Sequence, residues 1–426
     1  METVWHKVRG EFSVASGDEF ERTALHYLRI LWPTLIQSPR LQQLDRYGVD
    51  LCVPESDSHF AVVVQTKGFK VAEQLIKSQV TDQILPSIQK FLDSPLSCDH
   101  YVLLHNRDGS ERTLAALIQE KLDSLIPAGK AKHVQLWDRD SFIKEIRNRL
   151  ETHIRAKLAE RSQHLLQQHS QFFHFGNLFV SQVPLRQFGW KPDQPFPKEF
   201  VEGKFVDADI ARLIASPRDV RYSLLIGSFG LGKTTATLRA ADTHGLQIIY
   251  IPAHTIARKH GSQGTNILLR YFDAELNLLD DFPPDTVEML QHLIGAALGR
   301  LLRKANDQFV LVIDGLDEHV FYGTVQGLQW LTNELADLRC PIVLTTRREH
   351  FLSRIGDYEL AAETLSKANG ARRTVEILEL GAWTPAQAHE LLERATEQLQ
   401  DDTQIANVRR LREQLDAPAS RLALPE

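Results

Sequence analysis

Four residues near the middle of the chain have the types and spacing of a phosphate-binding loop. In the segment LLIGSFGLGKTT, Gly227, Gly232, Lys233 and Thr234 match the pattern G-x-x-x-x-G-K-[ST]. Glycines at these places let backbone N–H groups turn inward around phosphate oxygens. Lys233 can then reach the β- and γ-phosphates of a nucleotide, and the Thr234 hydroxyl can bind Mg²⁺. An apolar run precedes the loop and a helix-forming run follows it, so the N-terminal end of the helix would face the anion.

A carboxylate follows a second apolar run, QFVLVIDGLDE. The run predicts a buried strand that ends at Asp314, where one carboxylate can hold the magnesium ion directly or through water. Asp317 and Glu318 come next, and either could orient the water that attacks the phosphate. Spacing does not favour one of these two over the other.

A third apolar run, PIVLTTRRE, ends in Thr346 and Arg347. Ligands bind at the carboxyl ends of the strands in open α/β sheets, so this pair could sense the γ-phosphate. A strand end exposed to solvent would explain the same residues. The predicted nucleotide-binding residues are Gly227, Ser228, Phe229, Gly230, Leu231, Gly232, Lys233, Thr234, Thr235 and Arg347.

A second group of polar residues lies in the N-terminal part, in GVDLCVPESDSHFAVVVQTKGF. Gln65 and Lys67 lie two apart on a predicted strand and therefore on one face of it. Together with Asp50 and with Glu21 from an earlier helix, they could form a site that cleaves phosphodiesters. Oxygen ligands suit Mg²⁺, which polarises the phosphoryl oxygen and activates water, while Lys67 stabilises the developing charge. The predicted ligands in this part are Asp50, Gln65 and Glu21, beside Thr234 and Asp314 in the first site.

The spacing Asp–x₁₄–Gln–x–Lys is weak by itself, since a plain hairpin with Asp at its start and Lys at its edge would show it too. Residues 130–161 carry nine Lys or Arg against five acids, a local charge of +4. This stretch could contact DNA, and a solvated helix face explains it equally well.

The alternation of apolar runs and helical patterns predicts an α/β protein with a parallel sheet in its C-terminal part and a mixed α/β domain before it. We expect a first domain over 1–150, a helical linker or adapter over 151–205, the nucleotide-binding domain over 206–380 and a helical region over 381–426. The expected strands are 49–53, 60–65, 101–105, 134–137, 222–226, 246–251, 309–313 and 342–345. The main expected helices are 17–31, 72–92, 110–125, one from 140, 156–169, 384–399 and 403–415.

Composition limits the class of protein. The net charge of −6 over 426 residues excludes a globally basic nucleic-acid binder, so any DNA contact must come from a local patch. Cys52, Cys98 and Cys340 are odd in number and far apart, as expected of free thiols in the cytoplasm rather than of a disulfide framework. No apolar run is long enough to predict a membrane span, and the N-terminus lacks a secretion signal.

The phosphate loop, the DGLDE segment with glycine directly after Asp314, and TTR at residues 345–347 resemble the NACHT branch of the STAND ATPases over about residues 200–400. The resemblance implies a P-loop NTPase domain that binds ATP and Mg²⁺ and is a regulated switch. In that family ATP and a trigger drive oligomerisation, which activates an attached effector. The family usually continues through a winged helix and a repeat-built sensor. A chain that ends at Glu426 would therefore be a fragment, a minimal member or one that relies on a separate sensor protein.

Residues 12–145 resemble the Mrr-type restriction endonuclease domain of the PD-(D/E)xK superfamily. The matching features are Phe20–Glu21, Gly48–Leu51, Val64–Gln65 and Lys67, with VQLWDRDSFIKEI as a closing strand and helix. Gln65 replaces the superfamily's usual glutamate, which removes a negative charge, although Mrr-like domains commonly carry this glutamine. The resemblance implies Mg²⁺-dependent cleavage of double-stranded DNA.

Together these features resemble bacterial antiviral STAND proteins, in which a switch ATPase controls a nuclease and responds to a phage-derived trigger. The expected protein is therefore both an ATPase and an endonuclease that assembles into a homo-oligomer when triggered. Two alternatives remain: a type IV-like restriction enzyme of modified DNA, and an ATPase assembly module whose nuclease site is inert because of Gln65.

Overall fold

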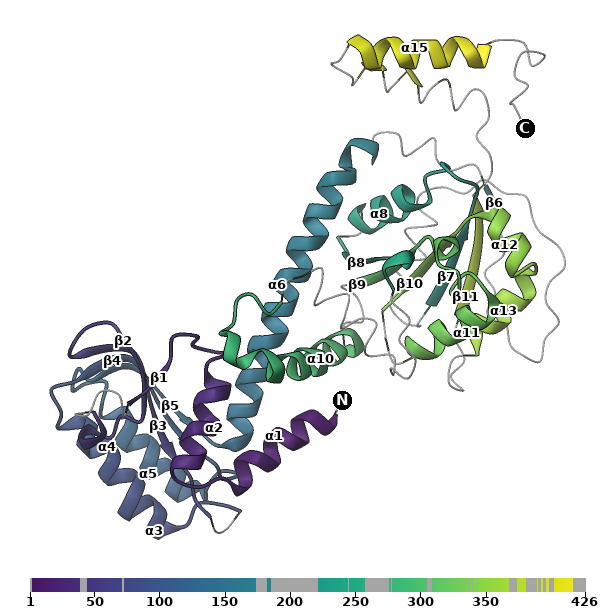
Figure 1. The fold of residues 1–426 in the computed structure, drawn as a ribbon. Helices are drawn as coiled ribbons and strands as arrows, with labels where there is room; N and C mark the ends of the chain where they lie inside the picture. The colour runs from purple at the N-terminus through teal and green to yellow at the C-terminus, as the bar shows by residue number, and fades with distance from the viewer. Residues whose placement is uncertain are drawn as a thin grey trace. The chain divides into compact units, whose positions relative to one another are not determined.

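The computed structural model describes two compact units, shown in Figure 1. One comprises Met1–Arg155 and Asn277–Gly299, and the other comprises Ala156–Leu276 and Arg300–Glu426. The described residues are 2–38, 44–70, 73–173, 182–184, 221–243, 245–256, 276, 278–304, 309–336, 338, 340–367, 374–380, 389, 392–393, 396–397 and 402–416. Among these residues, no helix is both long enough and apolar enough to cross a membrane.

The first unit contains a mixed sheet of five strands in its described part, in the order β1-β2-β3-β4-β5. The strands are β1 (Ile36–Gln37), β2 (Leu51–Pro54), β3 (His59–Lys67), β4 (Ser97–His105) and β5 (Ala131–Trp137). Antiparallel pairing joins β1, β2 and β3, whereas β3, β4 and β5 run parallel. Parallel neighbours need crossover connections, which the helices after β3 and β4 supply.

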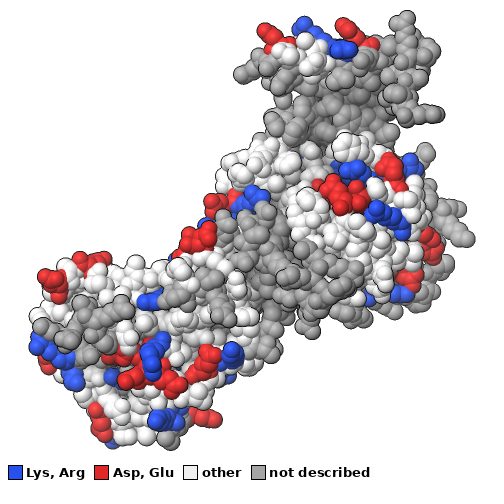
Figure 2. All heavy atoms as spheres, in the orientation of Figure 1, with Lys and Arg blue, Asp and Glu red and all other residues white. Residues whose placement is uncertain are grey.

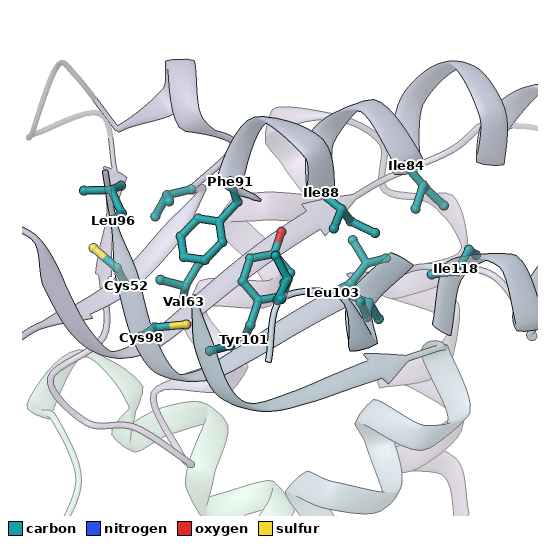
Figure 3. Close-up of a cluster of buried hydrophobic side chains, with 14 of the residues drawn as sticks. Cys52, Val63, Ile84, Ile88, Phe91, Leu96, Cys98, Tyr101, Leu103 and Ile118 are labelled. Carbon is teal, nitrogen blue, oxygen red and sulfur yellow. The ribbon is translucent and has the colours of Figure 1, made fainter. Parts of the chain in front are cut away.

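The helices of this unit cover both faces of the sheet. They are α1 (Glu2–Val14), α2 (Asp18–Leu28), α3 (Lys77–Gln79), the π-helical turn η3 (Val80–Ile84), α4 (Leu85–Leu92), α5 (Arg112–Asp123), α6 (Arg139–Phe173) and the first part of α10 (Val287–Lys304), with a 3-10 turn η2 (Asp45–Tyr47). Ile88 of α4 and Ile118 of α5 pack on Tyr101 and Leu103 of β4, all fully buried (Figure 3). On another side, rings from α1, α2 and α6 pack together: Phe12, Phe20, Tyr27 and Phe142.

The second unit contains a sheet of six described strands in the order β6-β11-β7-β10-β9-β8. Its strands are β6 (Gln182–Pro184), β7 (Arg221–Ile226), β8 (Gln247–Pro252), β9 (Phe309–Asp314), β10 (Ile342–Thr346) and β11 (Thr374–Leu380). All neighbours are parallel except β6 and β11. The strand cores are almost continuously apolar and buried, as expected of a parallel sheet covered on both faces.

Helices lie on both faces of this second sheet. They are α8 (Lys233–Thr243), the last part of α10, α11 (Val325–Glu334), α12 (Arg348–Arg354) and α13 (Tyr358–Ser366), with 3-10 turns η5 (Ala253–Thr255) and η7 (Leu316–Glu318). The unit also contains the helix α15 (Asp402–Asp416). Leu238 of α8 and Leu165 of α6 share a core with Leu225 and Val312. The other face of β7 contacts α11, where the Tyr222 hydroxyl donates to the Thr332 carbonyl. Figure 1 shows α8 on one side of the sheet and α11 and α13 on the other.

The fold class agrees with the expected mixed α/β protein, and each expected strand is present within a few residues. Among the elements found beyond the expected ones are α1 and the strands β1, β6 and β11. The helix expected over 72–92 has a described beginning at Lys77 and includes a π-helical turn just before Pro86, whose nitrogen has no hydrogen to donate. The expected boundary at residue 150 falls inside the continuous helix α6. After residue 173, the linker or adapter expected over 151–205 lies largely outside the described residues, as does the helix expected over 384–399.

The three cysteines are free and buried, as the sequence predicts. Burial raises the pKa of the Cys52 thiol to about 11 and that of Cys98 to about 12, with Asp99 adding to the second shift. These thiols stay protonated at neutral pH and act as small apolar side chains of the core in Figure 3.

Candidate functional site

The carboxyl ends of four parallel strands bring the predicted nucleotide-binding residues to one edge of the second sheet. Ile226, which ends β7, pairs with Thr346 of β10, and Pro252 of β8 pairs with Asp314 of β9. The loop after Ile226 turns through Gly230 and Gly232, both with positive φ (77° and 79°), before α8 begins. Side chains with L chirality rarely adopt that backbone conformation, so glycine is required for the loop path.

At Gly227, glycine is required for a different reason, which is close packing against a neighbouring strand. A Cβ placed there would lie 3.0 Å from the Leu380 Cβ at the end of β11. The strand that the sequence analysis did not predict thus packs against the first residue of the phosphate loop and fixes its position.

Lys233 lies at the start of α8 with its ammonium group turned into the loop. Its Nζ donates to the carbonyls of Gly227 at 2.7 Å and Ser228 at 3.1 Å. Burial lowers the pKa of Lys233, while Asp317 and Asp314 act in the opposite direction. A partly desolvated cation beside several backbone amides is an environment that suits a polyphosphate.

Asp314 is surrounded by hydroxyl groups from two neighbouring strands and one helix. Thr234 Oγ1 lies 3.0 and 2.8 Å from its two carboxylate oxygens, Tyr250 donates to Oδ2 at 2.7 Å, and Thr345 donates to Oδ1 at 2.5 Å. The Gly315 amide in turn donates to Thr345 Oγ1 at 2.8 Å. A carboxylate adjoining a threonine hydroxyl is a set of hard oxygen donors, and the residues therefore fit Mg²⁺.

Asp317 and Glu318 differ sharply in their surroundings. The Asp317 side chain is 2% exposed and holds Arg347, whose backbone N–H donates to Oδ1 at 2.9 Å and whose Nε lies 3.0 Å from Oδ2. The Glu318 side chain is 45% exposed, and its Oε2 lies 3.2 Å from His254 Nδ1. Asp317 is therefore used in a buried ion pair, whereas the Glu318 carboxylate faces solvent.

Arg347 links the strand tip to the phosphate loop. Besides Asp317, its guanidinium reaches Glu318 Oε1 at 3.5 Å and lies over the Phe229 ring, 4.8 Å from the centroid. Phe229 is 78% exposed and Ser228 donates to Glu349 at 2.6 Å. The remaining loop residues are half-buried: Leu231 lies between Gly230 and Gly232, and Thr235 lies in the first turn of α8.

In the first unit, the structure brings Asp50, Gln65 and Glu21 to one end of the antiparallel strands. Asp50 Oδ2 accepts from the Thr66 amide at 2.6 Å and from its hydroxyl at 3.1 Å. Glu21 Oε1 accepts from Gln37 Nε2 at 2.7 Å, and Gln37 pairs with Leu51 across β1 and β2. Glu21 therefore approaches the start of β2 through one intervening glutamine.

Gln65 is fully buried and its amide is engaged at both ends. Nε2 donates to the Gly48 carbonyl at 2.7 Å, and Oε1 accepts from the Tyr101 hydroxyl at 3.0 Å. Burial, and then the charge of Asp50, raises the pKa of Tyr101 well above its usual range, so the phenol remains a donor. A metal ion at this oxygen would have to share it with Tyr101.

Lys67 ends β3, beside His105 of β4, and is partly exposed. Within the described part of the chain, its ammonium group makes no hydrogen bond or ion pair. Burial lowers the pKa of His105 to about 4, so this neighbour is neutral near neutral pH. Lys67 is consequently a cation at the strand end, next to a neutral imidazole.

Gly48 is required by this arrangement, and its replacement gives a test of it. Its φ is +75°, and an added Cβ would lie 2.6 Å from Gln65 Nε2 and 3.0 Å from the Ser87 carbonyl. We expect Gly48→Ala to lower the free energy of unfolding by about 1–3 kcal/mol, measured by urea denaturation. Gly10→Ala in α1, where no atom lies within 4 Å of the added Cβ, is the control and should not destabilise. Equal stability of the two variants would contradict the packing described.

Other charged clusters behave as ion pairs. Glu55, His59 and Asp99 lie close enough together to share a metal ion, but Lys132 Nζ already bonds Asp99 at 2.7 Å. Arg139 likewise pairs with Asp108. Members of the basic stretch 130–161 therefore include paired cations, and Figure 2 shows acidic and basic side chains interspersed on the visible face of each unit. These observations favour the solvated-face explanation of that stretch over a DNA-binding patch.

Three participants in the second unit were not predicted from the sequence: Tyr250, His254 and Thr345. They lie at or near the carboxyl ends of β8 and β10, and that location was the available signal, since those ends line the ligand edge of an open α/β sheet.

Comparison with known proteins gives little further information. No family model and no curated protein matches the chain. Among solved structures, the crystal structure of Cdc6p from Pyrobaculum aerophilum matches with a TM-score of 0.29 and 16% sequence identity, over 44% of this chain and 46% of that chain. The chain thus spans about half the length of that protein, and we base the function on the site itself.

Proposed function

We propose that the second unit binds ATP with Mg²⁺ and hydrolyses it. The observation that carries this proposal is the grouping of Lys233, Thr234 and Asp314 at one sheet edge, below a loop made by positive-φ glycines. Lys233 would hold the β- and γ-phosphates, and Thr234 and Asp314 would hold the metal. When bound, the metal neutralises phosphate charge and orients the leaving group.

Direct binding tests this proposal. We expect the purified chain to bind ATP in isothermal titration at millimolar nucleotide with Mg²⁺, and EDTA to weaken that binding. AMP, which lacks the phosphates that Lys233 contacts, is the control ligand and should bind far more weakly. No uptake of ATP in the presence of Mg²⁺ would contradict the proposal.

Within this site, we assign the role of general base to Glu318 rather than Asp317. The Asp317 carboxylate is held by two groups of Arg347 and is nearly inaccessible. Glu318 folds back over Gly315, where an added Cβ would lie 3.1 Å from the Glu318 Cδ. Because Gly315 directly follows Asp314, the exposed carboxylate lies beside the metal ligand, where an attacking water could be oriented.

The assignment predicts opposite kinds of defect. Glu318→Gln should lower kcat for ATP hydrolysis by roughly 100-fold or more while ATP still binds. Asp317→Asn should instead release Arg347 and destabilise the unit, because a buried charged partner is lost. Steady-state hydrolysis and thermal melting distinguish the two. If Asp317→Asn abolishes hydrolysis in a protein of unchanged stability and Glu318→Gln does not, the roles are reversed.

We further propose that the first unit is a Mg²⁺-dependent endonuclease on double-stranded DNA. The supporting observations are that Asp50 bonds Thr66, which stands between Gln65 and Lys67 on β3, and that Glu21 is linked through Gln37 to the start of β2. ATP binding in response to a trigger, from a phage or through a sensor protein, would promote homo-oligomerisation and so activate cleavage. The engagement of Gln65 with Tyr101 favours the competing possibility, an inert nuclease site in an ATP-dependent assembly module.

A further inference from the structure

The Glu318 carboxylate is bracketed by two donors from different elements. His254 Nδ1 lies 3.2 Å from Oε2, and Arg347 Nη2 lies 3.5 Å from Oε1. The first contact is the shorter, and it comes from η5, the turn directly after β8. The sequence separation between His254 and Glu318 is 64 residues, so only the sheet topology brings them together.

The backbone around His254 is anchored although its ring is exposed. Ala253 is fully buried and Ile256 is 4% exposed, and the Ile256 carbonyl lies 3.1 Å from His319 Nε2. The turn η5 packs on η7, the turn that carries Glu318. The His254 side chain is 58% exposed, so the ring itself contributes little to the core.

To act as a general base, Glu318 needs a partner that fixes the position of its carboxylate. Its carboxylate is about half exposed and stands on a flexible side chain, which has several staggered rotamers. A general base is effective only when it is held within hydrogen-bond reach of the water it activates. Arg347 is already bound to Asp317 at 3.0 Å and stacked on Phe229, so its hold on Glu318 is the weaker one.

We propose that His254 is a positioning residue for ATP hydrolysis, which holds the Glu318 carboxylate beside the metal edge through its Nδ1–H. This inference rests on the ATPase function proposed above and on Glu318 as the base. His254 touches neither nucleotide nor metal in this role. Its removal should therefore affect turnover and leave nucleotide affinity nearly unchanged.

The test compares His254→Ala with His254→Asn. Alanine removes the donor, and we expect kcat to fall on the order of tenfold while KM for ATP changes less than about twofold. Asparagine keeps an N–H near the position of Nδ1 and should restore most of kcat. His164→Ala, at an exposed position of α6, is the matched control and should behave as wild type.

A double variant supplies the second readout. In a Glu318→Gln background, His254→Ala should cause no further loss of kcat, because the group that it positions is already gone. A residue that acts only through stability would lower activity in both backgrounds. The proposal is overturned if His254→Ala keeps or raises kcat, if asparagine is as defective as alanine, or if the two losses multiply.

These outcomes separate this inference from the function on which it rests. If wild-type protein does not hydrolyse ATP, both fail. If Glu318→Gln hydrolyses ATP normally, the base assignment fails and His254 loses its role with it. If Glu318→Gln is inactive and His254→Ala is normal, only the positioning role is wrong.

Discussion

Replacing Lys233 with alanine is expected to abolish ATP hydrolysis, with a loss of roughly 100- to 1000-fold, and to weaken ATP binding strongly. Its Nζ now donates to the carbonyls of Gly227 and Ser228, so the ammonium lies inside the loop that would enclose the phosphates. Removing a preorganised cation from a partly desolvated site costs far more than removing one from the surface.

Lys233→Ala also tests whether this lysine supplies much of the free energy of ATP binding. Burial lowers the pKa of Lys233, which means that the folded protein holds this cation in an unfavourable environment. The negative charges of Asp317 and Asp314 act against that effect. A bound polyphosphate would supply the missing compensation. Lys233→Ala should therefore leave the free protein folded and lose most of the stabilisation that ATP gives.

Thermal melting with and without ATP–Mg²⁺ measures this difference, alongside phosphate release. Lys367→Ala is the matched control, because that lysine is exposed directly after α13 in the same unit and, among the described residues, its ion pair is with Glu363 of that helix. If ATP stabilises Lys233→Ala as much as it stabilises the wild type and the Lys367→Ala control, the loop does not bind the nucleotide phosphates.

The grouping of Lys233, Thr234 and Asp314 could be predicted because most of its pattern is local. Lys233 and Thr234 follow their glycines within a few residues, and backbone geometry forces the turn between strand and helix. Asp314 lies 80 residues from Thr234, yet it was predictable because parallel strands place their carboxyl ends at one edge.

The choice between Asp317 and Glu318 could not be made from sequence. It depends on a single 3-10 turn, which buries one carboxylate against Arg347 and leaves the other exposed. His254 was missed for a similar reason, since its partner is set by the packing of two turns from distant parts of the chain. Strand β11 was missed because its residues come after the last recognised motif, although Leu380 sets the space available at Gly227.

In the first unit, even less of the site could be predicted, because the partners of its side chains are set by tertiary packing. The spacing of Gln65 and Lys67 predicts that both point to one face of β3, but it says nothing of their partners. Tyr101, which binds the Gln65 carbonyl, comes from the neighbouring strand and has no motif of its own. A glutamine in place of a carboxylate can be a metal ligand or a structural link between strands, and its contacts here serve the second role.

Replacing Lys67 with alanine is the second large effect that we expect. If the first unit cleaves DNA, Lys67→Ala should lower the rate of plasmid cleavage by roughly 100- to 1000-fold in the presence of Mg²⁺, ATP and the trigger. The reason is electrostatic. The Lys67 ammonium is not engaged by the described residues, and Lys67 follows Gln65 by two residues on β3, so that it could stabilise charge on the scissile phosphate.

The control is Lys90→Ala, which removes an exposed cation from α4 in the same unit. Both variants lose one positive charge, so general attraction to DNA falls equally, and binding measured without Mg²⁺ should be the same for the two. Only the rate of bond cleavage should separate them. Cleavage by Lys67→Ala at the Lys90→Ala rate would remove the nuclease assignment.

If the wild-type protein does not cleave DNA, the hydrogen bond from Tyr101 to Gln65 offers a testable reason. If the Tyr101 hydroxyl keeps the Gln65 carbonyl from a metal, then Tyr101→Phe, which removes that donor and little volume, should increase Mg²⁺ binding that depends on Asp50. Cleavage that appears in Tyr101→Phe and is lost again with Lys67→Ala would show a latent nuclease. If Tyr101→Phe neither binds metal nor cleaves DNA, the first unit is an assembly module. The Gln65 side-chain oxygen, which stands where a carboxylate is usual, would then have a structural role alone.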